Sequence, residues 1–157
     1  MIPLTRLLIK TVHSHDELDF DAPLLQAGLG GCPWRVAVAS ILLNRTRRAQ
    51  VQPILQELLR RWPTPMELAK ADRASLADLI RPLGFQHERS RRLVRFTAVF
   101  LEDTWDDLLE LPGVGPYVND AVGLVCFGCT AIVSGDPALV PYARKLDLAR
   151  VELGGSD

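Results

Sequence analysis

Two features of the sequence have the residue types and spacing for chemistry: a glycine-rich turn and, downstream of it, an aspartate at the start of a helix. The turn is Leu111-Pro-Gly-Val-Gly115, and its glycines permit a tight bend that exposes backbone amides where the next helix begins. Such amides form an anion site, for which a DNA phosphate, bound without regard to base sequence, is one ligand. The same pentapeptide could equally be a Pro-Gly turn that only joins two packed helices.

The aspartate is Asp136, in Ser134-Gly-Asp-Pro137. An Asp before Pro at a helix start is a good N-cap, which is a purely structural role. The same position favours the ionised carboxylate, which in a cleft could stabilise a cationic sugar transition state or orient a water molecule. Taken alone, the residue is more typical of a cap than of a catalyst.

Three cysteines, Cys32, Cys126 and Cys129, cannot all pair with one another, and this odd number predicts a reduced, intracellular protein. Cys126-x-x-Cys129 fits two small buried residues at the end of an apolar helix better than it fits half of a metal site. The sequence offers no second cysteine pair or Cys/His cluster to complete four ligands, so we expect no metal site.

Helical periodicity dominates the chain and alternating strand patterns are scarce, which predicts a compact all-α protein with short connections. No stretch of 18 uninterrupted apolar residues exists, so we expect no membrane span. The expected helices are PWRVAVASILL from Pro33, residues 47–61, one starting at Pro65, one capped by Asp72 and ending at Ile80, residues 86–101, a short one from Thr104-x-x-Asp107 to Pro112-Gly113, residues 115–127, and a last one starting at Asp136-Pro137.

Four stretches that occur in order connect these features to a known family. They are PWRVAVASILLNRT, IRPLGFQHERSRRLVRF, GPYVND and GDPALVPY. With the hairpin and Asp136 they resemble the helix-hairpin-helix DNA glycosylase superfamily, the endonuclease III-like proteins. The similarity is closest to its branch of methyl-CpG-binding mismatch thymine/uracil glycosylases, and it runs from about Leu24 to Leu146.

The resemblance implies two helical lobes with an active cleft between them, within a single domain over residues 1–157. One lobe would comprise about 1–32 plus 130–157. The other would comprise about 33–129 and include the hairpin at 111–115.

Carried over residue by residue, the resemblance gives Asp136 the role of the catalytic carboxylate. It places Gln26 and Tyr117 in the base pocket, where the Gln26 amide would read the edge of uracil or thymine. Gly113 and Gly115 would hold a backbone phosphate.

Two further residues would enter the duplex. Arg45 matches the arginine that fills the space left by an extruded nucleotide, and Phe85 stands where the family has a wedge, usually Leu, beside the orphan base. Arg47 and Arg48 form a cluster with Arg45 that would neutralise phosphates if it lines a cleft, although a solvated face is the other interpretation. A second basic cluster has the same two interpretations: Arg89, Arg91, Arg92 and Arg95.

Tyr117 also bears on the reaction type. Bifunctional members of the family have a lysine here that forms a Schiff base and cuts the strand, which tyrosine cannot do. The resemblance therefore implies a monofunctional enzyme without lyase activity. It implies no cofactor either, because the iron–sulfur cysteines are absent after Asp136, while binding of a monovalent cation at the hairpin stays open. Residues 33–56 contain no Asp or Glu, which disfavours the adenine-specific branch.

We therefore expect a glycosylase that hydrolyses the N-glycosidic bond of a mismatched or damaged pyrimidine, thymine or uracil opposite guanine, in duplex DNA. The alternatives are a glycosylase for another modified pyrimidine, and a non-catalytic duplex-binding module. We expect the protein to be a monomer and to bind duplex DNA. The expected location is the cytoplasm, with its nucleoid, or the nucleus, depending on the source.

The charge distribution agrees with DNA as a partner. The net charge is only −1, which taken alone disfavours a polycationic coat. From Arg35 to Arg95, however, 13 residues are basic and 5 are acidic, whereas the remainder holds 5 basic and 14 acidic residues. This division predicts that one face of the protein contacts a short length of DNA, and that the rest of the surface attracts DNA only weakly.

Overall fold

The computed structural model describes residues 3–12 and 17–154, and within these ranges it contains helices and no strand. The all-α prediction is confirmed. An isolated antiparallel bridge joins Thr5 to Asp107 and so fixes the N-terminal segment against the approach to the hairpin. No helix formed by the described residues is long and apolar enough to cross a bilayer.

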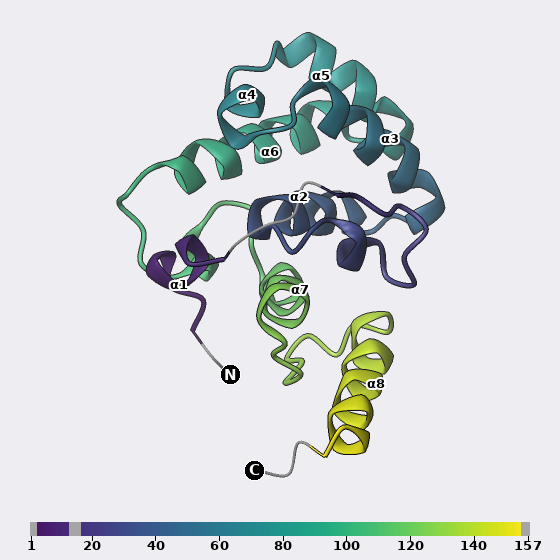
Figure 1. Ribbon diagram of the computed structural model, residues 1–157. Coiled ribbons are helices and arrows are strands. Elements are labelled where there is room, and N and C mark those ends of the chain that lie inside the picture. The colour runs from purple at the N-terminus through teal and green to yellow at the C-terminus, as the bar shows by residue number, and fades with distance from the viewer. Residues whose placement is uncertain (1–2, 13–16, 155–157) are drawn as a thin grey trace.

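Helix α2 (Pro33–Leu43) lies at the centre of the molecule (Figure 1). Pro33 stands in its first turn, where an amide would have no partner within the helix, as predicted. Nine of its eleven residues are buried, so the helix packs on neighbours on every side. These neighbours are α3 (Arg48–Arg61), α6 (Gln86–Leu101), α7 (Pro116–Phe127) and the short 3-10 turn η1 (Leu25–Gly28).

Helices α3, α4 (Pro65–Ala69), α5 (Arg73–Ile80) and α6 form a group on one side of α2 (Figure 1). Thr64 and Asp72 cap α4 and α5, because their side-chain oxygens accept from the amide of the third residue of each helix. A 3-10 turn, η2 (Arg81–Leu83), joins α5 to α6. The apolar stripe predicted on α3 is buried: Val51, Ile54, Leu55, Leu58 and Leu59.

The hairpin lies on the other side of α2, between the 3-10 turn η3 (Leu108–Glu110) and α7. The predicted start of this short element at Thr104 is wrong. The Thr104 hydroxyl donates to Glu102 at 3.2 Å, whereas Asp107 Oδ1 accepts from the Leu109 amide at 3.0 Å and caps η3. Helix α1 (Arg6–Lys10) lies alongside, where the Arg6 amide donates to the carbonyl of Asp106 at 2.9 Å.

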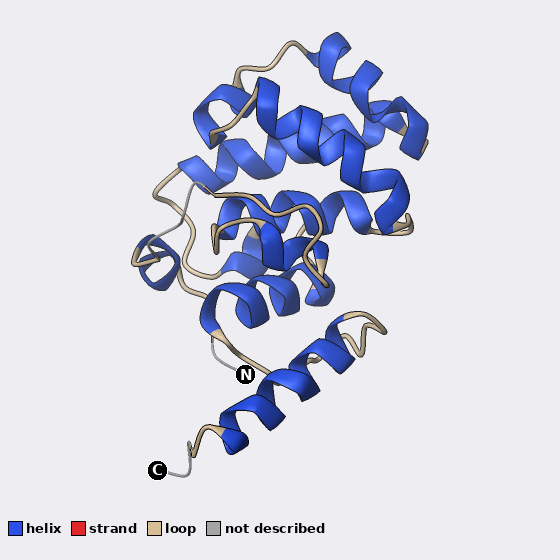
Figure 2. Ribbon diagram, turned by 45° about the vertical axis from the view of Figure 1, so that its right-hand side comes forward, coloured by secondary structure: helices blue, strands red, loops and turns tan. Residues whose placement is uncertain are grey.

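Helix α8 (Leu139–Glu152) extends away from the other helices toward the C-terminus (Figure 2). Its buried residues are Leu139 and Ala143, and residues 147–152 are exposed. The N-terminal end of α8 is therefore the part that packs, and it packs beside α7. The two lobes expected at 1–32 plus 130–157 and at 33–129 stay a prediction in their boundaries.

Candidate functional site

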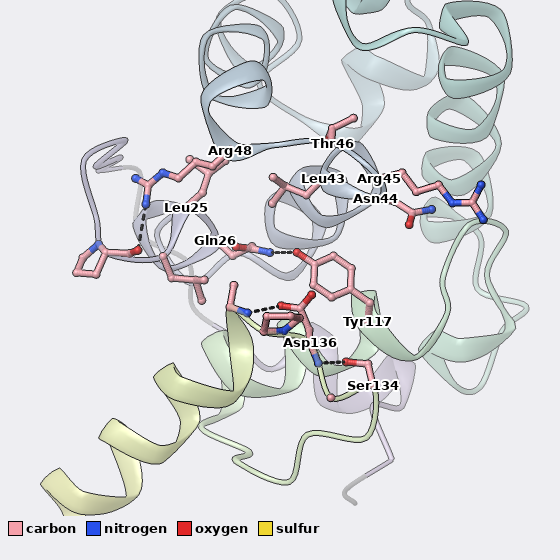
Figure 3. Close-up of a pocket in the computed structure, with 15 residues that line it drawn as sticks. Leu25, Gln26, Leu43, Asn44, Arg45, Thr46, Arg48, Tyr117, Ser134 and Asp136 are labelled. Atoms are coloured by element: carbon pink, nitrogen blue, oxygen red, sulfur yellow. Dashed lines mark hydrogen bonds between the residues drawn. The ribbon is translucent and has the colours of Figure 1, made fainter.

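A cavity of about 500 Å³ opens where η1, the α2–α3 turn, the start of α7 and the turn before α8 meet (Figure 3). The predicted catalytic residue Asp136 and the predicted base-pocket residues Gln26 and Tyr117 line it from three segments far apart in the sequence. The remaining lining residues are Pro23, Leu24, Leu25, Leu43, Asn44, Arg45, Thr46, Arg48, Ser134, Gly135, Pro137 and Ala138. Asp136 is the one acidic residue among those that line the cavity, so any carboxylate chemistry there belongs to it.

Asp136 caps the turn that starts α8 and still faces the cavity (Figure 3). Its Oδ2 atom accepts from the amides of Ala138 at 2.9 Å and Leu139 at 3.0 Å. These amides at a helix N-terminus favour the ionised carboxylate. Because both cap bonds go to Oδ2, Oδ1 is the oxygen available for chemistry. The capping and catalytic roles that the sequence left open are therefore compatible in one side chain.

A second carboxylate, Asp120, holds the segment that carries Asp136. It is 5% exposed, and its oxygens accept from the amides of Val133 (3.1 and 3.2 Å) and Ser134 (2.7 Å). In the sequence, Asp120 stands out only as the last residue of GPYVND. The signal that could have found it is a single charged residue in the apolar run of α7, which requires a buried partner.

Gln26 and Tyr117 form a hydrogen-bonded pair on the opposite wall. Gln26 is 1% exposed, and its Nε2 donates to the Tyr117 hydroxyl at 2.8 Å and to Ser40 Oγ at 3.3 Å. Ser40 Oγ in turn donates to the Val36 carbonyl at 2.7 Å. Ser40, which no sequence motif marks, thereby fixes the orientation of the Gln26 amide.

The pKa of Tyr117 is raised to about 12. Burial is the main cause, the hydrogen bond from Gln26 opposes it, and the charge of Asp136 adds to it. The phenol therefore keeps its proton throughout the physiological range, and it can donate that proton while it accepts from Gln26.

The segment that carries Gln26 is held by Arg48. Its Nη2 donates to the Phe20 carbonyl at 2.8 Å and its Nη1 to the Pro23 carbonyl at 3.0 Å. Gly28 closes the same segment, because a Cβ there would overlap the carbonyl of Asp19. Arg48 thus has a role inside the protein, and its predicted contact with DNA stays a prediction, as does that of the exposed Arg47.

Arg45 and Phe85 lie outside this buried network. Arg45 is exposed at the rim of the cavity, and its guanidinium points away from Gln26 (Figure 3). Phe85 precedes α6 and is 79% exposed, an unusual position for a large aromatic ring. Both backbones are left-handed, with φ of 61° at Arg45 and 50° at Phe85.

Gly113 and Gly115 line a separate cavity of about 200 Å³, which shares Tyr117 with the larger one. Gly113 has φ of 80°, and a Cβ there would lie 2.8 Å from Cγ of Arg92 on α6. Glycine is therefore required at this position both for the turn and for the close approach of Arg92. The combination of a helix start with a nearby guanidinium suits an anion.

Cys32, Cys126 and Cys129 are all half-buried, and none of them forms a disulfide. Burial, with a smaller effect of Cys32, raises the pKa of Cys126 to about 12, so that thiol stays protonated. Across residues 3–12 and 17–154, no three His, Cys, Asp or Glu side chains gather closely enough to hold a metal ion.

The sequence resembles known proteins over most of this architecture. Residues 38–149 match the family described as "HhH-GPD superfamily base excision DNA repair protein". A "Thymine-DNA glycosylase" of Aeropyrum pernix is 38% identical over 104 residues, which cover 61% of this chain and 46% of that protein. An "Adenine DNA glycosylase" of Mycobacterium tuberculosis is 35% identical over 160 residues, which cover 98% of this chain and 48% of that protein.

Among solved structures, that of "a thermostable thymine-DNA glycosylase" superimposes with a TM-score of 0.58 and 26% identity. The match covers 63% of this chain and 49% of that one. The chain thus spans about half the length of the relatives that it matches.

Proposed function

The chain belongs to the HhH-GPD superfamily of base excision DNA repair proteins, and from this premise we propose that it is a monofunctional DNA glycosylase. It acts as a monomer on duplex DNA and removes thymine or uracil opposite guanine. The observation that carries the proposal is the cavity in which the capped Asp136 carboxylate faces the Gln26–Tyr117 pair.

Asp136 supplies the charge that the reaction needs. When the bond between C1′ and the base nitrogen breaks, its electron pair leaves with the base and the sugar becomes cationic. Oδ1 of Asp136 stabilises this cation, while Oδ2 stays bonded to the amides of Ala138 and Leu139. Water then adds to C1′ and gives up a proton to the carboxylate, which leaves an abasic site.

The opposite wall suits a base edge on which a donor adjoins an acceptor. The Nε2 of Gln26 is occupied by Tyr117 and Ser40, so its carbonyl oxygen is the group that can accept from the base. The Tyr117 hydroxyl can donate beside it. An N3–H next to a carbonyl, as in uracil and thymine, matches this pair.

Adenine excision is the second candidate, because the match that covers 98% of the chain is to an adenine DNA glycosylase. Adenine also offers a donor beside an acceptor, so the wall alone does not reject it. A purine leaving group, however, is helped by an acid that protonates its ring nitrogen, and the cavity lining contains Asp136 as its one acidic residue. This favours the pyrimidine.

The residues that line the cavity support hydrolysis without strand cleavage, because a lyase needs an amine beside the sugar. No lysine lines the cavity. Lys145 lines an adjoining groove of about 500 Å³ with Tyr142 and Leu146, on the far side of Pro137 and Ala138. Because Lys145 lines this groove and not the cavity that contains Asp136, we expect no Schiff base with the sugar.

The test is single-turnover base release from duplexes that carry T:G, U:G, U:A, A:G, A opposite 8-oxoguanine, or a 5-substituted uracil opposite guanine. Abasic sites are then cleaved with alkali. We expect release from T:G and U:G, with strand breaks only after alkali. Release from the adenine duplexes alone would establish the second candidate, and release from the 5-substituted uracils alone another modified pyrimidine. Binding without any release would establish a non-catalytic module.

A borohydride trapping arm tests the monofunctional assignment. Wild-type protein should give no covalent adduct with DNA. An adduct that disappears in Lys145→Gln would contradict the assignment and would identify the amine responsible.

A further inference from the structure

Among the described residues, two that are not glycine have a positive φ, and they are Arg45 and Phe85. A left-handed backbone costs such residues about 1–2 kcal/mol each. Neither side chain is buried, so packing of the side chain does not offset this cost. Something else in the fold must hold both backbones in place.

The two residues stand in different turns. The turn at Asn44 and Arg45 has the angles of a type II turn, with φ −63° and ψ 114° at Asn44 followed by φ 61° at Arg45. The Thr46 amide closes it by donating to the Leu43 carbonyl at 3.2 Å. Phe85 follows Gly84 at the junction of η2 and α6, where it is the residue before the first turn of α6.

One guanidinium connects these turns. Nε of Arg89 donates to the Gly84 carbonyl at 2.9 Å, and Nη1 of the same side chain donates to the Asn44 carbonyl at 3.2 Å. Each carbonyl belongs to the residue just before a left-handed one. The peptide plane that contains this carbonyl also contains the amide nitrogen of the next residue, so fixing it restrains φ at Arg45 and at Phe85.

The Arg89 side chain is suited to this contact. It is half-buried, and its pKa is lowered by that burial and by the charge of Arg92, although an arginine stays charged at neutral pH. Its charge strengthens both hydrogen bonds. The planar fork directs two N–H groups at fixed angles, which the single ammonium of a lysine cannot reproduce.

We propose that Arg89 is a positioning residue that sets the spacing of the two turns, so that Arg45 and Phe85 enter the duplex as one unit. This rests on the proposed function, because it presumes that both side chains enter DNA. With Arg89 in place, insertion of one side chain places the other at its own site. Without it, each turn adopts its orientation independently, and the two insertions become uncoupled.

A double-mutant cycle in DNA affinity tests the proposal. The dissociation constant is measured by fluorescence anisotropy on a duplex that carries a tetrahydrofuran abasic analogue opposite guanine, for the wild type, Arg45→Ala, Phe85→Ala and the double variant. The loss of affinity in the double variant should differ about fivefold from the product of the losses in the two single variants. This is the coupling expected of residues that act together. When the same cycle is measured in Arg89→Lys and in Arg89→Gln, the loss in the double variant should equal the product of the two single losses within error.

Arg95→Gln is the matched control, because it removes the same charge from the same helix and has no bond to either turn among those described. Its cycle should retain the fivefold coupling of the wild type. Arg89→Lys keeps the charge and the aliphatic stem, and so tests the fork in a variant that preserves packing. Amide hydrogen exchange in 43–47 and 84–86 should rise in both Arg89 variants and stay at the wild-type level in Arg95→Gln.

The outcomes separate the two proposals. The role of Arg89 would be overturned if the coupling persists in both Arg89 variants, or if the wild-type background shows no coupling. Either result would leave the glycosylase proposal standing. Coupling that vanishes only in the Arg89 variants, in a protein that releases no base, would support Arg89 and refute the glycosylase. Single variants that bind as tightly as the wild type would overturn both the insertion and the role of Arg89.

Discussion

Gln26 and Asp120 lie in the interior, where the Gln26 Nε2 and the Asp120 carboxylate are hydrogen-bonded, whereas Arg45 and Phe85 are exposed to solvent on left-handed backbones. The first pair belongs to the pocket wall and to the support of Asp136. The second pair belongs to the turns beside the pocket. The two regions are joined by Arg45, whose side chain leaves from the rim of the cavity.

The difference indicates how each region prepares for its substrate. The pocket is organised by satisfied hydrogen bonds and a helix N-terminus, so its polar groups are oriented before a base arrives. The turns are organised by strain that the fold maintains, so that exposed side chains are directed outward. Substitutions in the pocket should therefore damage chemistry, whereas substitutions in the turns should damage DNA affinity and spare stability.

The largest effect should come from Asp136→Asn. The amide retains one oxygen that can accept from Ala138 and Leu139, so the cap is kept while the negative charge is lost. Base release under single-turnover conditions should fall by about 10³-fold, with little change in the unfolding midpoint. Asp136→Ala should show the same loss of rate and, in addition, lose about 1 kcal/mol of stability from the missing cap. A rate near that of the wild type in Asp136→Asn would exclude the catalytic role.

The second largest effect should distinguish the role of Arg48 from that of its neighbour Arg47. Arg48→Gln frees the Phe20 and Pro23 carbonyls, so the segment that carries Gln26 loosens and kcat/KM should fall by about tenfold. Arg47→Gln removes the same charge without those bonds, and should weaken DNA binding and lower the slope of log K against log salt by about 1. Kinetics and binding titrations at several salt concentrations measure both. Equal effects of the two variants on all these quantities would contradict the separation.

These residues also show what the sequence could and could not predict. Helices α3, α5 and α6 were predictable because apolar stripes and capping side chains are local signals. The start of η3 was not, because the hydroxyl of Thr104 bonds to Glu102 and leaves the cap to Asp107.

In the site, Gln26 was accessible only through the family resemblance. It lies outside the long helices, and the segment before it is held by Arg48, which is distant in the sequence. The positive φ of Arg45 and Phe85 was likewise invisible, because neither residue type favours that conformation. The bond from Arg89 to Asn44 spans 45 residues, so no local pattern predicts it.

The third effect concerns the Tyr117 hydroxyl, whose pKa in the folded protein is about 12, against 10.0 for the free side chain. Between pH 10 and pH 12 the unfolded chain loses this proton while the folded protein keeps it. The unfolded state therefore binds fewer protons, and the free energy of unfolding should fall as the pH rises through this window. Chemical denaturation at pH 9, 10, 11 and 12 measures the slope. Tyr117→Phe should show a shallower fall, because the group whose pKa differs between the two states is then absent. An equally steep fall in Tyr117→Phe would contradict the assignment.

The smallest effect tests the strained turns on stability alone. At Phe85 the backbone is left-handed and the ring is 79% exposed, so removal of the ring loses little buried surface. Glycine adopts this conformation freely and alanine does not, so Phe85→Gly should be more stable than Phe85→Ala by about 1 kcal/mol.

The matched pair is Arg95→Gly and Arg95→Ala, at an exposed position inside α6, where glycine should instead be the less stable by about 1 kcal/mol. Urea unfolding of the four variants gives both differences. Opposite signs at the two positions would show that the turn at Phe85 stores strain. Glycine that destabilises both positions equally would mean that the turn stores none, and the contrast between a relaxed pocket and strained turns would then be wrong.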